Sequence, residues 1–91
     1  MEDLSIVIVN YKTWDNLSLC LESILKQSEI KMKVIVVDNN SKDNQLSFFK
    51  QKYAWVHWIE NSQNYGFAKA CNIGASIITS KWSLFLNPDT I

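Results

Sequence analysis

The sequence predicts an α/β fold, an open and mostly parallel sheet with flanking helices in the order βαβαβαβ. Three observations support this prediction. Short, unbroken runs of apolar and mainly β-branched residues recur along the chain, segments with the apolar spacing of helices separate them, and each run ends in Asn, Asp or Glu. Right-handed crossovers turn such an order into a parallel sheet whose helices cover its faces.

The apolar runs are predicted to be the strands. Residues 6–9 (Ile-Val-Ile-Val) and 34–37 (Val-Ile-Val-Val) lack polar alternation, which is typical of parallel strands that are covered on both faces. Residues 56–59 include His57, which suits an edge strand. Residues 82–86 form the last predicted strand, which stops before Asn87 and Pro88.

The segments between these runs have helical periodicity. A first helix is expected over residues 14–27, with a stripe of Leu17, Cys20, Leu21, Ile24 and Leu25. A second is expected over residues 44–53, with one face made by Leu46, Phe49 and Tyr53. A third starts near Gly66, and small residues in its stripe would let it lie close to the sheet; the stripe comprises Phe67, Ala70, Cys71, Gly74 and Ile78.

Composition excludes several classes of function. The 91 residues carry nine Lys and nine acids without any Arg, so no basic patch exists for nucleic acid, and no arginine clamp exists for phosphate. With only Gly66 and Gly74, neither the dinucleotide fingerprint nor the P-loop is present. The two cysteines have no metal-binding spacing and are expected to be reduced, half-buried thiols on helices. The apolar runs are too short for a bilayer span or a secretory signal, which favours a cytoplasmic chain.

Polar residues follow every predicted strand. They are Asn10-Tyr11, Asp38-Asn39-Asn40, Glu60-Asn61 and Asn87-Pro88-Asp89. Turn chemistry alone favours Asn and Asp at such places, but ligands of open parallel sheets also bind outside the carboxyl ends of the strands. Together these residues predict a crevice lined with amides and carboxylates, which suits hydroxyls, base edges and a hard cation.

Particular residues carry more specific hypotheses. Asp89, after a rigid proline, is a candidate ligand for Mg²⁺ or Mn²⁺, with a solvated turn as the alternative. Asp38 is a candidate acceptor for a base N–H, and the alternative is that it caps the turn to Ser41. Gly66 at a helix start favours a close approach to an anion, which Lys69 could also reach; the alternative is a capped helix with a surface lysine.

Four motifs in order resemble glycosyltransferase family 2, in particular its rhamnosyltransferase-like branch. They are Ser5 to Tyr11, Val36-Val37-Asp38-Asn39-Asn40-Ser41, the spaced series Asn61, Asn64, Gly66, Phe67, Ala68, Ala70, Asn72 and Gly74, and Leu84-Phe85-Leu86-Asn87-Pro88-Asp89. The resemblance covers nearly the whole chain. It implies the GT-A fold, a Rossmann-like arrangement whose N-terminal half binds the nucleotide of a nucleotide-diphosphate sugar.

The resemblance also assigns roles by position. Asn10 and Tyr11 would border the base, Asp38 would contact it, and the motif containing Asn40 belongs to the same site. The segment beside ribose and diphosphate would comprise Asn64, Gly66, Lys69 and Asn72. Asn87-Pro88-Asp89 stands where the family has Asp-x-Asp, so Asp89 is the one carboxylate left to bind the metal.

The resemblance implies inverting transfer of a sugar from a UDP- or dTDP-sugar to a polysaccharide or glycolipid acceptor. No residue here matches the general base, which is expected beyond Ile91. Residues 1–91 are therefore expected to form one truncated domain that binds the donor and lacks the acceptor half, in a parent that is cytoplasmic or peripheral at the inner face of a membrane. The alternative is a non-catalytic nucleotide-binding or interaction module. The unpaired edge at residues 82–86 predicts self-association.

Overall fold

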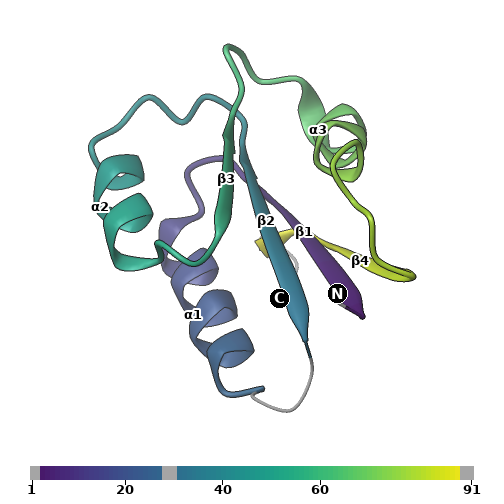
Figure 1. Ribbon diagram of the computed structural model, residues 1–91. Coiled ribbons are helices and arrows are strands. Elements are labelled where there is room, and N and C mark those ends of the chain that lie inside the picture. The colour runs from purple at the N-terminus through teal and green to yellow at the C-terminus, as the bar shows by residue number, and fades with distance from the viewer. Residues whose placement is uncertain (1–2, 28–30, 89–91) are drawn as a thin grey trace.

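The computed structural model describes residues 3–27 and 31–88. The described residues form one four-stranded parallel sheet with strand order β3-β2-β1-β4 (Figure 1). In chain order the elements are β1 (Leu4–Asn10), α1 (Trp14–Leu25), β2 (Met32–Asp38), α2 (Gln45–Lys52), β3 (His57–Glu60), α3 (Gly66–Ala75) and β4 (Trp82–Leu86). The predicted fold class and element order are confirmed.

Helices cover both faces of the two inner strands. Helices α1 and α2 lie on one side of the sheet and α3 on the other (Figure 1). Because side chains alternate along a strand, Ile8 and Val36 pack into the core beneath α1 and α2, whereas Val7 and Val37 pack beneath α3. All four side chains are fully buried, which explains why β1 and β2 are apolar without alternation.

Helix α3 lies unusually close to the sheet because of Gly74. A Cβ atom at this position would lie 2.6 Å from Cγ1 of Val7 and 3.1 Å from Cγ2 of Val37. The small neighbours Ala70 and Cys71 are also buried against the strands. The predicted role of small residues in this helix is confirmed.

Several expected boundaries differ from the structure. Helix α1 ends at Leu25 rather than residue 27, because the N–H groups of Lys26 and Gln27 bond to carbonyls three residues back and tighten the last turn. Phe67 is 42% exposed instead of belonging to the buried stripe, since it lies in the first turn of α3. Ile78 follows the end of α3, yet it still packs against the core beneath that helix.

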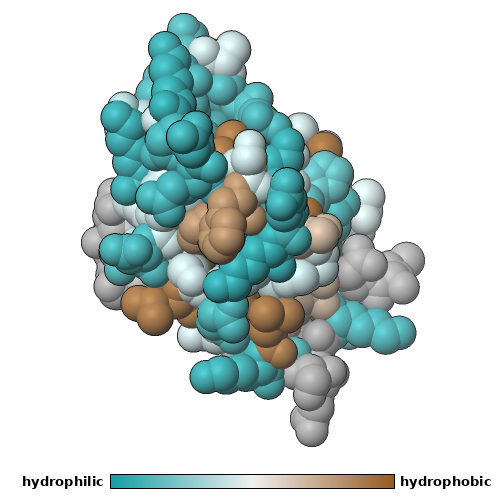
Figure 2. All heavy atoms as spheres, turned by 90° about the vertical axis from the view of Figure 1, so that its left-hand side faces the viewer, coloured by the Kyte–Doolittle hydropathy of each residue, from teal (hydrophilic) through white to brown (hydrophobic). Residues whose placement is uncertain are grey.

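The sheet has two edge strands among the described residues, and the side chains of β4 are largely exposed. Strand β3 is an edge, as predicted, and so is β4 among the described strands. Trp82 is 65% exposed, Leu84 46% and Phe85 41%. By contrast, the face made by α1 and α2 is largely hydrophilic, with apolar side chains in small groups (Figure 2).

Both cysteines lie on helices as free thiols, as the sequence predicts. Cys20 lies on α1 and Cys71 on α3, and both are free thiols that are largely buried. Within residues 3–27 and 31–88, no helix has the length and apolar character needed to cross a membrane.

Candidate functional site

The carboxyl ends of the strands meet at one edge of the sheet, as the sequence predicts. Asn10 of β1 pairs with Asp38 of β2, which in turn pairs with Glu60 of β3. On the other side of β1, Ile8 pairs with Leu86, the last residue of β4. The polar residues after each strand therefore gather along the same rim.

A hollow of about 220 Å³ opens at this rim. Its lining residues come from β1, the ends of β2 and β4, and the start of α3; they are Val9, Tyr11, Asn39, Asn64, Gly66, Phe67 and Asn87. The hollow lies where strand order reverses, since the chain passes from β1 to β2 on one side and returns to β4 on the other. Such a switch point is where open α/β sheets place their ligands.

Alternation along the strands decides which rim residues line the hollow. Val9, Tyr11 and Asn39 have the parity of the side chains that face α3, and all three line it. Asn10 and Asp38 have the opposite parity and lie toward α1 and α2. Of the residues predicted for the site, Tyr11, Asn64, Gly66 and Asn87 are thus brought together around the hollow.

Asp38 is the centre of a buried network and is 1% exposed. Its Oδ1 accepts hydrogen bonds from Nδ2 of Asn10 and from Oγ of Ser41, each at 2.8 Å. Its Oδ2 accepts from the backbone N–H of Ser41 at 3.0 Å, which is the predicted turn-capping alternative. The Ser41 hydroxyl also accepts from the backbone N–H of Lys12 at 3.0 Å. The network therefore ties the loop after β1 to the loop after β2.

The start of α3 presents backbone to the hollow. Gly66 has φ of +80°, a conformation that favours glycine, and Oδ1 of Asn64 accepts its N–H at 2.8 Å. The partial positive charge of a helix N-terminus favours an anion at this end. Lys69, one turn further, places its ammonium 4.4 Å from the centre of the Tyr65 ring. The structure thus shows the predicted glycine at a helix start and an exposed Lys69, whereas the N-cap residue Tyr65 makes no side-chain capping bond.

Other predicted site residues lie away from the hollow. Asn40 adopts φ of 65° in the loop after β2, and Asn72 is exposed on α3. Neither lines the hollow, nor does Lys69. Asp89 lies outside the described residues. Within the described part of the chain, no group of three or more His, Cys, Asp or Glu residues gathers to hold a metal ion.

Val9 and Phe67 line the hollow but are not among the residues that the sequence predicts for it, and Asn39, which is predicted only as one of the polar residues at the rim, lines it as well. Parity could have identified Val9 and Asn39, because they share the face of Tyr11. Phe67 could have been identified from its place in the first helical turn, where the sheet no longer lies beneath it. Its exposed ring and that of Tyr11, which is also 42% exposed, give a polar crevice two apolar surfaces.

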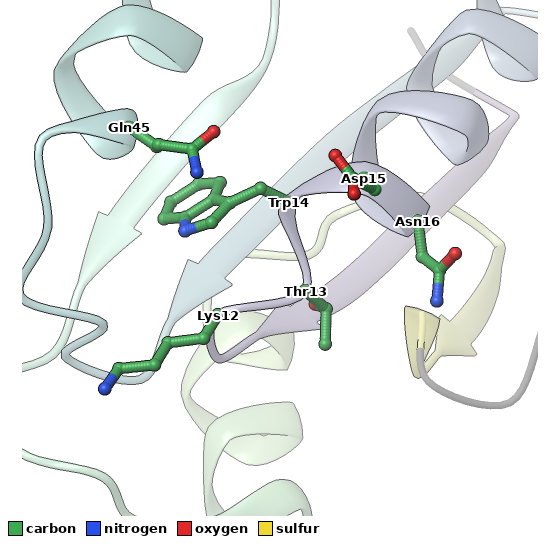
Figure 3. Close-up of a pocket in the computed structure, with 6 residues that line it drawn as sticks. All are labelled: Lys12, Thr13, Trp14, Asp15, Asn16 and Gln45. Carbon is green, nitrogen blue, oxygen red and sulfur yellow. The ribbon is translucent and has the colours of Figure 1, made fainter.

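A second hollow of about 360 Å³ lies on the other side of the sheet, at the start of α1. Figure 3 shows Gln45 of α2 beside the Trp14 ring, with Lys12 pointing away from both. Trp14 is buried, and its Nε1 donates to Oδ2 of Asp43 at 2.8 Å. Asp15 and Asn16 start the helix on the opposite side of Trp14 from Gln45 (Figure 3). These side chains converge on no common point, so the rim hollow is the better candidate site.

Comparison with known proteins identifies related sequences. The family model described as Glycosyl transferase family 2 matches residues 5–91. An uncharacterized glycosyltransferase of Haemophilus influenzae is 34% identical over 94% of this chain and 29% of its own length. A poly(ribitol-phosphate) beta-glucosyltransferase of Bacillus spizizenii is 35% identical over 94% of this chain and 14% of its own length. The chain therefore spans less than a third of these relatives.

Solved structures share the fold. S. aureus TarS 1-349 in complex with UDP superposes with a TM-score of 0.82 at 23% identity, covering 98% of this chain and 28% of that one. The mannosyltransferase PcManGT of Pyrobaculum calidifontis, in complex with GDP-Man and Mn²⁺, also gives 0.82, at 20% identity, covering 97% of this chain and 28% of that one. The four-stranded α/β arrangement is thus that of the N-terminal part of these GT-A proteins.

Proposed function

The chain belongs to glycosyl transferase family 2, and from this premise we propose that its rim hollow binds the nucleotide of a UDP- or dTDP-sugar. The observation that carries the proposal is the position of the hollow, which lies at the switch point of the sheet beside the N-terminus of α3. TarS has been crystallised with UDP, which supports a nucleotide of this class.

The lining residues suit the parts of such a ligand. The exposed Tyr11 ring offers a face on which a base can stack. The amides of Asn64 and Asn87 offer partners for sugar hydroxyls, and the start of α3 favours the charge of the diphosphate. Asp38 is 1% exposed and uses three acceptor positions within the chain, so we propose that it supports the base through the loops that it joins and not through a direct contact from the hollow.

A divalent ion would complete the site. PcManGT was solved in complex with GDP-Man and Mn²⁺, and such an ion would stabilise a diphosphate leaving group. Asn87 lines the hollow, but among the described residues no three or more His, Cys, Asp or Glu side chains gather to hold an ion. We assign the ion to Asp89 together with oxygens of the diphosphate.

For the protein as a whole, we propose inverting transfer to a cell-surface polysaccharide or glycolipid. The B. spizizenii relative acts on poly(ribitol phosphate), which supports a polymer acceptor. The general base would come from sequence beyond Ile91, so residues 1–91 would bind donor without transferring sugar. A rhamnose-type donor on dTDP remains part of this proposal, and the choice of nucleotide tests it.

Calorimetric titration of UDP, dTDP and GDP, each with and without Mn²⁺, tests the proposal. Tyr11→Ala should weaken binding by about 1–3 kcal/mol, the usual contribution of a base stacked on an aromatic ring. Phe48→Ala removes another exposed aromatic ring, on α2 and away from the crevice, and should leave affinity unchanged. Equal loss in both variants, or no binding of any nucleotide by the wild-type chain, would contradict the proposal. Nucleotide binding by a complete protein that transfers no sugar would favour the non-catalytic module.

A further inference from the structure

Asn39 joins the sheet to the loop that leads into α3, and its side chain is buried, with 2% exposed. Its Oδ1 accepts hydrogen bonds from Nδ2 of Asn61 at 2.9 Å and from the backbone N–H of Tyr65 at 3.4 Å. Its Nδ2 donates to the carbonyl oxygen of Gly66 at 3.2 Å. Its backbone N–H donates to the carbonyl of Asn10 at 2.8 Å, which extends the β1–β2 pairing. Through its backbone N–H and its side-chain amide, Asn39 therefore connects β1 and the end of β2 with both ends of the β3–α3 loop.

Apart from the bonds of Asn39, the β3–α3 loop is tied to the sheet by the Asn61 N–H, which donates to the Asp38 carbonyl at 2.9 Å, and its other hydrogen bonds lie within the loop or at the start of α3. Ser62, Gln63 and Asn64 are exposed, so the loop gains little from apolar burial. A Cβ at Gly66 would meet no atom within 4 Å, so packing does not restrain this residue either. A segment with few buried contacts opens readily unless hydrogen bonds hold it. The side chain of Asn39 supplies such bonds at both ends of the loop.

We infer that Asn39 is a positioning residue for nucleotide binding, acting through Tyr65 and Gly66 to hold the start of α3 against the crevice. This role rests on the proposed function. Three of the hydrogen-bonding positions of the Asn39 side chain are used within the chain, and the residue is almost fully buried. Its contribution to affinity therefore comes from the loop that it fixes.

Three variants separate this role from general stability. Asn39→Ala removes all three side-chain hydrogen bonds. Asn39→Asp keeps both acceptor positions, but it replaces the donor to Gly66 by a carboxylate oxygen that faces the Gly66 carbonyl oxygen in a buried position. Asn44→Ala is the matched control, because Asn44 is an exposed asparagine at the start of α2 whose side chain makes no capping bond.

The measurements are UDP affinity by calorimetry and amide hydrogen exchange without nucleotide, both well below the unfolding midpoint. For Asn39→Ala we expect UDP binding about tenfold weaker and exchange at residues 61–66 about tenfold faster, the effect of losing buried hydrogen bonds worth about 1–2 kcal/mol. Asn39→Asp should weaken binding and speed exchange at residues 61–66 at least as much as Asn39→Ala, because its buried carboxylate repels the Gly66 carbonyl oxygen. Exchange in β1 and the affinity of Asn44→Ala should be unchanged.

Distinct results overturn the inference and the function on which it rests. A wild-type chain that binds no nucleotide overturns both. If the wild-type chain binds UDP and a folded Asn39→Ala binds it equally well, only the role of Asn39 is overturned. The same holds if amide exchange in Asn39→Ala is faster over the whole sheet and the UDP affinity is unchanged. If Asn39→Ala does not fold, Asn61→Ala removes one partner from a partly exposed position, and the same comparison applies.

Discussion

Replacing Gly74 by alanine is expected to destabilise the fold and displace α3 at the same time. The added Cβ would lie 2.6 Å from Cγ1 of Val7 and 3.1 Å from Cγ2 of Val37, where ordinary contacts are 3.4–4 Å. Both valines are fully buried, and a β-branched side chain has few alternative rotamers. The methyl groups therefore cannot turn away, and α3 has to move outward.

The size of the effect follows from two opposed contributions. Alanine gains about 1 kcal/mol over glycine in a helix interior. Overpacking a buried contact typically costs about 1–3 kcal/mol. Because the shorter contact meets a stiff side chain, we expect the upper part of that range and a net loss of about 1–2 kcal/mol. At roughly 4–8 °C per kcal/mol for a domain of this size, the midpoint should fall by about 5–15 °C.

Thermal and urea unfolding followed by circular dichroism measure this loss. Ala68→Gly on the exposed face of α3 calibrates the helix-propensity contribution, since no sheet residue lies beneath it. Val7→Ala makes room for the new methyl group, so the double variant with Gly74→Ala should lose less stability than the sum of the single changes. A Gly74→Ala chain as stable as the wild type, or strict additivity with Val7→Ala, would show that the contact with Val7 does not limit how closely α3 packs.

Two further predictions concern the β4 edge and the thiols. The chain should self-associate through β4. In sedimentation experiments Leu84→Lys should shift it to the monomer, whereas Leu19→Lys, at an exposed position on α1, should not. A wild-type chain that is monomeric at high concentration would contradict this prediction. Burial raises the pKa of Cys20 and of Cys71 above the ordinary 9.0, so their contribution to stability is complete below pH 9.0 and is lost as the pH rises through the raised values. Urea unfolding at a series of alkaline pH values should therefore show that the free energy of unfolding falls more steeply with pH for the wild type than for the double variant Cys20→Ala/Cys71→Ala. Equal slopes in the two proteins would contradict this prediction.

Sequence patterns predicted the strands well because burial on both faces leaves a direct mark on composition. A strand such as β1 has to be apolar at successive positions when helices cover both sides, and residues 6–9 are. Helix ends were less predictable. The end of α1 depends on backbone hydrogen bonds in its last turn, which the apolar stripe does not encode.

The candidate site was predictable as a rim but not as a set of contacts. Polar residues after each strand indicate where ligands bind, yet the direction of each side chain depends on register and parity. Pairing of Asn10 with Asp38 turns both toward α1 and α2 and leaves Tyr11 and Asn39 to line the hollow. Phe67 was placed on the buried stripe because helical spacing does not reveal where the sheet beneath a helix stops.

Asp38 and Ser41, which do not line the hollow, join two loops whose backbone is strained. Lys12, Asn40 and Lys42 adopt positive φ within the described chain, a conformation that costs L-residues about 1–2 kcal/mol each. All three lie in the loops that Asp38 and Ser41 join. The network thus holds strained backbone in place in the two loops that follow β1 and β2. Changes at Asp38 should consequently lower stability and nucleotide affinity together, whereas changes at Tyr11, which only lines the hollow, should lower affinity alone.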